Sequence, residues 1–118
     1  MLTLFVLSLV YNIKLFPVSP ATASAIVGRW GYDLVAPNRK NVSRIAAYVS
    51  GDCYAITEFH TPKSTVLLCG YYVSPLDQVL GVGRQMIHTI LEDESVRIDH
   101  EYLFQTHKKA YLEFLLHL

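Results

Sequence analysis

The N-terminal part of the chain has a long apolar run followed by a helix start signal. Residues 1–16 are almost continuously apolar, which predicts a long buried strand. Ser19 and Pro20 have the form of an N-cap and a first-turn proline, so a helix is expected from Pro20 to about Trp30. Residues 31–41 are rich in turn-forming side chains and predict a loop or a short second helix.

Three strand-like runs occupy the middle of the chain. They extend over residues 43–49, 53–60 and 65–73, and each is rich in aromatic, β-branched or other apolar side chains. The segments between them are three and four residues long and contain Gly51 and Pro62. Connections of this length form hairpins, so the three runs predict an antiparallel meander.

The last third of the chain predicts a helix, a strand and a second helix. Residues 82–92 place their apolar side chains on one side of a helix, and residues 96–104 have the pattern of a strand. Thr106 is a plausible N-cap for the last helix. Apolar positions on one face of that helix are Tyr111, Phe114, Leu115 and Leu118. The whole order predicts a single α/β (α+β) domain over residues 1–118, with a mixed, mostly antiparallel sheet flanked by helices.

Composition limits the size and the partners of this domain. The chain has 118 residues, of which 52% are hydrophobic and 17% charged, so it suffices for one core but not for two domains. Ten basic and ten acidic side chains give a net charge of zero. Proteins that follow nucleic-acid phosphates need clustered Lys and Arg, and therefore no nucleic-acid partner is expected.

The apolar N-terminus has an alternative interpretation as a signal peptide. Residues 2–10 resemble its hydrophobic region and Ala21-Thr22-Ala23 its cleavage site, but a basic N-terminal region is missing. The run is too short to span a bilayer as a helix. We favour the buried strand, and with it a cytoplasmic protein without a membrane partner.

Cysteines and histidines do not form a recognisable site in the sequence. Cys53 and Cys69 are too few for a disulfide framework, and both lie in apolar runs where a thiol packs as a small hydrophobe. The five histidines have no zinc-ligand spacing to a cysteine or carboxylate. No metal is therefore expected.

The segment Gln78-Val79-Leu80-Gly81-Val82-Gly83 is the strongest chemical signal of the chain. It follows an apolar strand that ends in Val73-Ser74-Pro75 and opens an amphipathic helix. Glycines one residue apart leave successive backbone N–H groups free of side chains, and the helix adds its unpaired first-turn donors. Such a loop favours a phosphate or pyrophosphate.

Two common phosphate loops do not fit. The dinucleotide fingerprint needs a third glycine where the chain has Met86, and the Walker loop needs Lys and Ser or Thr where it has Arg84 and Gln85. The remaining pattern, Gln-x-x-Gly-x-Gly after a strand ending in Val-x-Pro, resembles the acyl-CoA loop of the GNAT superfamily of N-acetyltransferases. A plain glycine turn between a core strand and a core helix is the alternative.

The resemblance implies a GNAT-like fold and acetyl-CoA, or a related acyl-CoA, as cofactor. In that family the strand before the loop and the strand after the next helix run parallel and splay apart around the pantetheine arm. A backbone N–H near Tyr72 or Val73, at a bulge in the strand, would hold the acyl oxygen. The implied cofactor-binding residues are Tyr72, Val73, Gln78, Val79, Leu80, Gly81, Val82, Gly83 and Arg84.

Catalytic residues follow less directly. Amine acetylation needs a base, for which Glu58, Asp99 and Glu101 are candidates, and an acid for the departing thiolate. Family members often carry a tyrosine late in the last helix, where this chain has Phe114-Leu115. Tyr111, one turn earlier, is the nearest substitute, and Tyr102 is a second candidate. Of these we expect Glu58 as base and Tyr111 as acid.

The expected function is transfer of an acetyl group to a small-molecule or protein amine. A departure from the family pattern is that this chain stops near the end of the last helix, before the final two strands of typical members. A homodimer would complete the sheet. The alternatives are a catalytically silent GNAT-fold interaction protein, with or without acyl-CoA, and a small secreted or membrane-associated protein with a merely structural loop.

Overall fold

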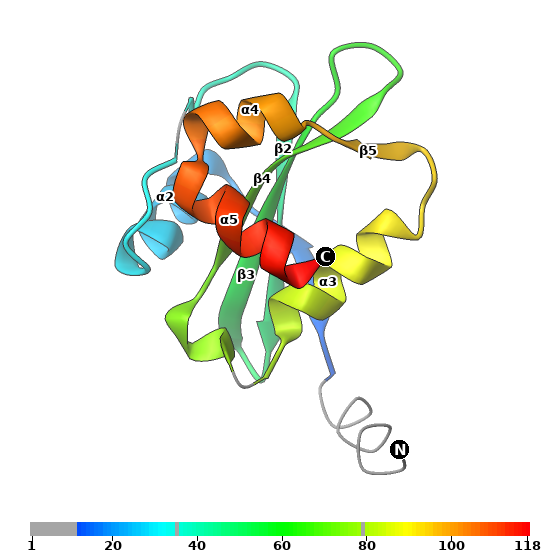
Figure 1. Cartoon of the computed structure of the whole chain (residues 1–118). Helices are drawn as coiled ribbons and strands as arrows, with labels where there is room; N and C mark the ends of the chain where they lie inside the picture. The colour runs from blue at the N-terminus through cyan, green and yellow to red at the C-terminus, as the bar shows by residue number, and fades with distance from the viewer. Residues whose placement is uncertain (1–11, 35, 79) are drawn as a thin grey trace.

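The computed structural model describes residues 12–34, 36–78 and 80–118. The strands form one sheet with helices packed against it (Figure 1). In chain order they are β1 (Lys14–Pro17), α2 (Pro20–Arg29), β2 (Val42–Val49), β3 (Asp52–His60), β4 (Val66–Val73), the 3-10 turn η1 (Pro75–Gln78), α3 (Val82–Leu91), β5 (Val96–Ile98), α4 (His100–Thr106) and α5 (Lys108–His117).

The sheet has the simple order β1-β2-β3-β4-β5. β1 to β4 pair antiparallel, and β5 runs parallel to β4. Ser50 and Gly51 both have positive φ, as the two-residue turn between β2 and β3 requires. The predicted fold class, a mixed and mostly antiparallel sheet flanked by helices, is confirmed.

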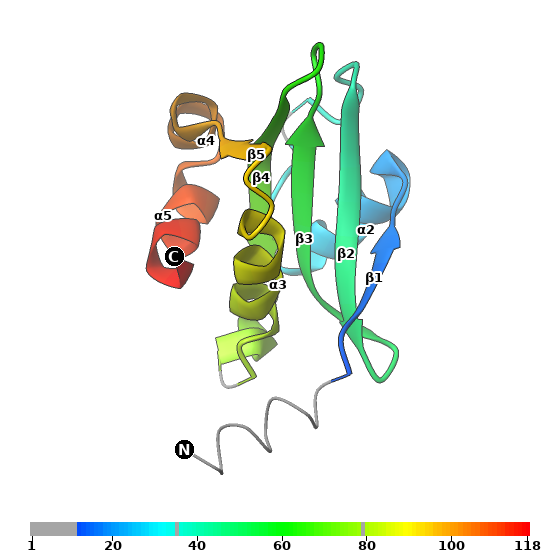
Figure 2. The same ribbon diagram turned by 90° about the vertical axis from the view of Figure 1, so that its right-hand side faces the viewer.

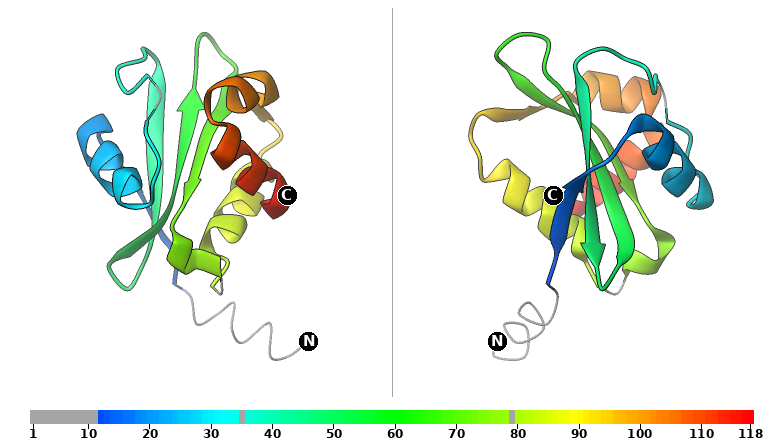
Figure 3. Two further views of the ribbon diagram at one scale, coloured as in Figure 1. Left: turned by 60° about the vertical axis from the view of Figure 1, so that its left-hand side comes forward. Right: turned by 180° about the vertical axis from the view of Figure 1, so that it is seen from behind.

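Helices cover both faces of the sheet. α2 packs on one face through Ala23, Ile26 and Val27, while α3 packs on the other face, as Figures 2 and 3 show. α5 lies against β4 and contributes Phe114 to the α3 cluster and Ala110 to the α2 cluster. It therefore reaches the cores on both faces of the sheet.

The predicted starts of the first helix and of the meander are confirmed. The Ser19 hydroxyl accepts the Thr22 N–H at 3.2 Å, and Pro20 is the first residue of α2. β2, β3 and β4 each begin or end within one residue of the predicted bounds. The described residues between α2 and β2 contain no helix, so that segment is a loop.

The prediction for the N-terminus is wrong where the structure tests it. Residues 1–11 lie outside the described residues, and the strand that follows covers only Lys14–Pro17. All four of its residues are exposed, and within the described residues β1 lies at the edge of the sheet beside β2. Among the described residues, no helix is long and apolar enough to cross a bilayer.

The predicted strand over residues 96–104 is wrong beyond Ile98. The Asp99 carboxylate accepts the Tyr102 N–H at 3.3 Å and starts α4 at His100, so a side-chain cap ends the strand. Thr106 closes α4 instead of starting the last helix, and His107 is the residue that precedes α5. The apolar pattern of this segment belongs to a short helix.

The short β5 leaves part of β4 without a strand neighbour. β5 pairs with β4 only at Val66, Leu67 and Leu68, whereas β4 continues to Val73. The parallel pairing expected for these two strands is confirmed. Within the described residues, α5 packs against β4.

Candidate functional site

A cavity of about 460 Å3 lies at the C-terminal end of β4. Its walls come from three places: the residues just after α2, the stretch from the end of β4 to the first turn of α3, and one side of α5 from Lys109 to His117. The lining residues are Trp30, Tyr32, Val73, Ser74, Pro75, Asp77, Gln78, Leu80, Gly81, Arg84, Lys109, Glu113 and His117. The predicted glycine loop therefore borders a real cavity.

Of the predicted cofactor residues, five line this cavity: Val73, Gln78, Leu80, Gly81 and Arg84. Val82 and Gly83 are buried at the start of α3, and Tyr72 is a buried residue of β4. Val79 lies outside the described residues. The structure thus gathers most of the loop at one place but does not bring Tyr72 to the cavity wall.

The backbone of Val73 is turned toward the unpaired edge of β4. The Ser74 N–H donates to the Tyr54 carbonyl of β3 at 2.9 Å, and N–H directions alternate along a strand. The Val73 N–H therefore points away from β3. The register irregularity between β3 and β4 falls between Glu58 and Phe59, where Cys69 is the extra residue of β4, while Tyr72 and Val73 are regularly paired. The prediction of a bulge at Tyr72 or Val73 is therefore wrong, because the irregularity lies at Cys69.

The first N–H groups of α3 have a partner inside the chain. The two carboxylate oxygens of Asp77 accept the N–H of Val82 and the N–H of Gly83, each at 2.8 Å. Asp77 is only 2% exposed. Burial raises the pKa of this carboxyl, and the two N–H groups oppose the rise. Two of the donors expected to bind phosphate are thus occupied by a carboxylate.

The two loop glycines are required for different reasons. Gly81 has φ +71, a left-handed conformation that residues other than glycine rarely adopt. The space around it is open, because a Cβ there would meet no atom within 4 Å. A Cβ on Gly83 would overlap the Tyr71 hydroxyl and lie 3.1 Å from Val73. Gly81 therefore shapes the open side of the loop, and Gly83 allows α3 to pack on β4.

Charged side chains from α3 and α5 face the cavity. Arg84 extends from α3 and donates weakly to the Leu116 carbonyl at 3.4 Å, and Lys109 of α5 lies over the Tyr32 ring at 4.7 Å. Glu113 lies 3.3 Å from His117, which contacts the Tyr71 hydroxyl at 2.5 Å. Partial burial lowers the pKa of His117, so the ring favours its neutral form. The walls thus carry two basic side chains and a histidine, together with the carboxyl groups of Asp77 and Glu113.

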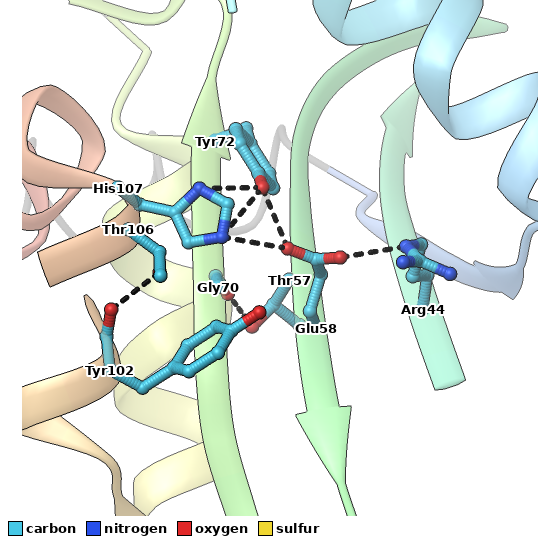
Figure 4. A network of polar contacts seen from close by, with 8 residues as sticks. All are labelled: Arg44, Thr57, Glu58, Gly70, Tyr72, Tyr102, Thr106 and His107. Atoms are coloured by element: carbon cyan, nitrogen blue, oxygen red, sulfur yellow. Dashed lines mark hydrogen bonds and ion pairs between the residues drawn. The ribbon is translucent and has the colours of Figure 1, made fainter. Parts of the chain in front are cut away.

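Glu58 lies in a buried polar network between the sheet and the α4–α5 junction, shown in Figure 4. One of its oxygens accepts Nε of Arg44 at 2.8 Å, and the other accepts the Tyr72 hydroxyl at 2.7 Å. The Tyr72 hydroxyl also contacts Nδ1 of His107 at 3.0 Å. Gly70 makes room for this carboxylate, because a Cβ there would overlap Glu58.

Burial determines the protonation of this network. It raises the pKa of Glu58, and the Tyr72 hydroxyl and Arg44 oppose the rise. It lowers the pKa of His107 to about 4, with a smaller contribution from Arg44. Nη2 of Arg44 is one of the few buried polar atoms in the described residues without a hydrogen-bond partner. Glu58 does not line the cavity at the end of β4.

Tyr111 lies apart from both places. Its hydroxyl contacts Nδ1 of His100 at 2.9 Å, and its ring stacks on Phe114. It does not line the cavity. Glu58 and Tyr111, predicted as base and acid, are therefore separated from the glycine loop in this structure. The described residues contain no group of three or more His, Cys, Asp or Glu side chains placed to hold a metal ion.

Sequence reasoning missed three residues that shape these places. Asp77 directly precedes the glycine loop, but its carboxylate accepts N–H groups five and six residues further on, which is outside the spacing of the usual N-cap signal. Gly70 interrupts an apolar strand, which indicates close approach of a neighbouring side chain. The pairing of Arg44 with Glu58 had no local signal, because 14 residues separate them.

Comparison with known proteins gives structural matches only. No protein-family model and no curated protein matches the sequence. A ribosomal-protein-S18-alanine N-acetyltransferase from Escherichia coli matches with a TM-score of 0.56 and 15% identity, covering 87% of this chain and 76% of that chain. A ribosomal-protein-alanine N-acetyltransferase from Brucella melitensis biovar Abortus 2308 matches with a TM-score of 0.55 and 11% identity, covering 75% and 79%.

A third structural match has a different acceptor in its description. It is an aminoglycoside antibiotic 6'-N-acetyltransferase from Acinetobacter haemolyticus, with a TM-score of 0.51 and 16% identity, covering 87% of this chain and 88% of that chain. The chain has a GNAT-like fold. At these identities the likeness concerns the fold, and a shared fold does not fix the reaction.

Proposed function

We propose that this GNAT-like protein binds acetyl-CoA, or a related acyl-CoA, and transfers the acyl group to an amine. The observation that supports it most is the cavity at the end of β4. It is bordered by the glycine loop, by the start of α3 and by the end of β4, which lies beyond the part of that strand that pairs with β5. The sequence resemblance concerns the same loop, and the structural matches share the fold that carries it.

The residues of the cavity fit parts of such a ligand. Space around Gly81 is open, and Arg84 and Lys109 are cations that would attract its phosphates. The Val73 N–H faces the free edge of β4 and would donate to an acyl oxygen. Bound acyl-CoA supplies the activated acyl group. The Asp77 carboxylate is the feature that fits least, because it holds two N–H groups of the loop.

The roles of Glu58 as base and Tyr111 as acid remain part of the proposal. The raised pKa of Glu58 suits a base, although its contacts are with Arg44 and Tyr72. The Tyr111 hydroxyl contacts His100, and Tyr111 does not line the cavity that the glycine loop borders. The histidine of the cavity, His117, with Glu113 beside it, is the alternative proton acceptor.

Calorimetric titration with acetyl-CoA tests the binding step. Arg84→Glu and Lys109→Glu should each weaken binding about tenfold, because each removes a charge-assisted contact to a phosphate. Matched controls are Arg97→Glu and Lys108→Glu, which make the same charge changes on exposed residues outside the cavity lining. Absence of binding by the wild-type protein at millimolar acetyl-CoA would refute the proposal.

Release of the free thiol in the presence of an amine panel tests the transfer step. Glu58→Gln, Tyr111→Phe and His117→Gln should separate the roles, because loss of the true proton acceptor lowers kcat much more than binding. If the protein binds acetyl-CoA but thiol release stays at background with all amines, a catalytically silent GNAT-fold interaction protein becomes the better description. The acceptor would be an amine-bearing small molecule or protein.

A further inference from the structure

The start of α3 is capped by an anion of the chain itself. Both oxygens of the Asp77 carboxylate accept backbone N–H groups, from Val82 and from Gly83, at 2.8 Å each. These are the first two residues of α3, whose N–H groups have no acceptor within the helix. The carboxylate therefore satisfies the donors, and the positive end of the helix, that a phosphate would otherwise use.

A phosphate and Asp77 cannot use these donors at the same time. Each N–H group makes one good hydrogen bond, and two anions within contact distance repel each other. Asp77 is also held on its backbone, because its N–H donates to the Ser74 carbonyl at 2.9 Å and its carbonyl accepts the Gly81 N–H at 3.0 Å. A competing phosphate must displace the side chain while this turn stays in place.

The cavity gives the displaced carboxylate a place to go. Asp77 itself lines the cavity of about 460 Å3, as do Arg84 and Lys109. A rotation of its side chain out of the loop would move the carboxylate from two N–H donors toward these cations. The open space around Gly81, where a Cβ would meet no atom within 4 Å, leaves the other side of the loop accessible.

We propose that Asp77 is an intramolecular competitor for the phosphate-binding donors of α3 and so determines how strongly the cavity takes pyrophosphate-containing ligands. The inference rests on the proposed acyl-CoA site. It assigns Asp77 a negative effect on affinity for phosphates, opposite to that of Arg84 and Lys109. Ligand binding is therefore coupled to release of the Asp77 carboxylate from Val82 and Gly83.

Replacement of Asp77 by a neutral residue tests the competition. Asp77→Asn and Asp77→Ser keep a side chain able to accept one N–H but remove the charge. We expect both to bind CoA and inorganic pyrophosphate at least about tenfold more tightly than the wild type, measured by calorimetry. Pantetheine, which has no pyrophosphate, should bind all three proteins alike. Backbone amide NMR signals of Val82 and Gly83 should shift on addition of pyrophosphate at lower concentrations in the variants.

Glu113→Gln is the matched control. It removes a negative charge from the same cavity but contacts neither Val82 nor Gly83 in the structure. If it tightens binding as much as Asp77→Asn, the effect is general electrostatics and the competition is refuted. Far-UV circular dichroism establishes that each variant is folded, and the serine variant serves if the asparagine variant is not.

The outcomes separate this inference from the proposed function. Equal CoA and pyrophosphate affinity in the wild type and both Asp77 variants overturns the competition and leaves the acyl-CoA site standing. Tighter pyrophosphate binding in the variants without any CoA binding supports the competition and refutes the acyl-CoA site. Absence of binding of both ligands by all proteins refutes both.

Discussion

Asp77 and Glu58 are two carboxylates that are each 2% exposed, and they are stabilised in different ways. Asp77 receives two backbone N–H groups that lie five and six residues further along the chain. Glu58 receives side chains, Arg44 and Tyr72, each 14 residues away on a neighbouring strand. A carboxylate bound by a helix start can be exchanged for another anion, whereas one paired with an arginine in the sheet fixes the packing around it.

The largest expected effect is that of breaking the Arg44–Glu58 pair. Arg44→Met leaves Glu58 buried without its cation, so the free energy of unfolding should fall by about 3–5 kcal/mol. Urea denaturation measures the change. The double variant Arg44→Met/Glu58→Leu should recover much of the loss. Arg97→Met, at an exposed position of β5, should change stability little. A loss as small as that of Arg97→Met would show that the pair does not fix the packing.

Gly70→Ala should have the next largest effect. A Cβ at this position would lie 2.8 Å from Cδ of Glu58 and overlap one of its oxygens, and overpacking of this kind costs about 1–3 kcal/mol. Thermal unfolding measures the change. Gly28→Ala, in α2 with nothing within 4 Å of the added Cβ, should instead be neutral or stabilising. Removal of Glu58 in a double variant should make Gly70→Ala tolerable.

Asp77→Asn should reduce stability by about 1–2 kcal/mol, because it replaces a charged helix cap by a neutral one. Denaturation without ligand measures this loss, and saturating pyrophosphate should compensate for it more in the variant than in the wild type. The opposite signs of the stability and affinity changes would distinguish this carboxylate from Glu58. A variant as stable as the wild type would mean that the two N–H bonds contribute little.

At neutral pH the smallest expected effect is that of His107, whose contribution is a pH dependence in acid. Burial lowers its pKa from the ordinary histidine value of 6.5 to about 4 in the folded protein. Between these values the unfolded chain binds the proton and the folded protein does not, so His107 makes stability fall as pH decreases from about 6.5 to about 4. His107→Gln should lose this part of the pH slope in urea denaturation, while His100→Gln at the exposed start of α4 should keep it.

Much of the fold could be predicted because its signals are local. The hairpin lengths between residues 42 and 73, the Ser19-Pro20 start of α2 and the glycine-led start of α3 each depend on a few adjacent residues. The segment after Ile98 could not be predicted in the same way, because an aspartate cap and an apolar alternation gave competing signals for the same residues. The loop of the candidate site was found, but its occupant Asp77 was not.

The sequence alone was enough for the order of the strands and helices except α4, for the loop at Gln78–Gly83 and for the resemblance to an acyl-CoA loop, because hydrophobic period and glycine spacing act over short distances. Only the tertiary structure decided that Asp77 holds the N–H groups of Val82 and Gly83, that Glu58 pairs with Arg44, and that Tyr111 lies away from the loop. These contacts depend on which residues the fold brings together across the sheet and at the start of α3, and no simple sequence spacing predicts them.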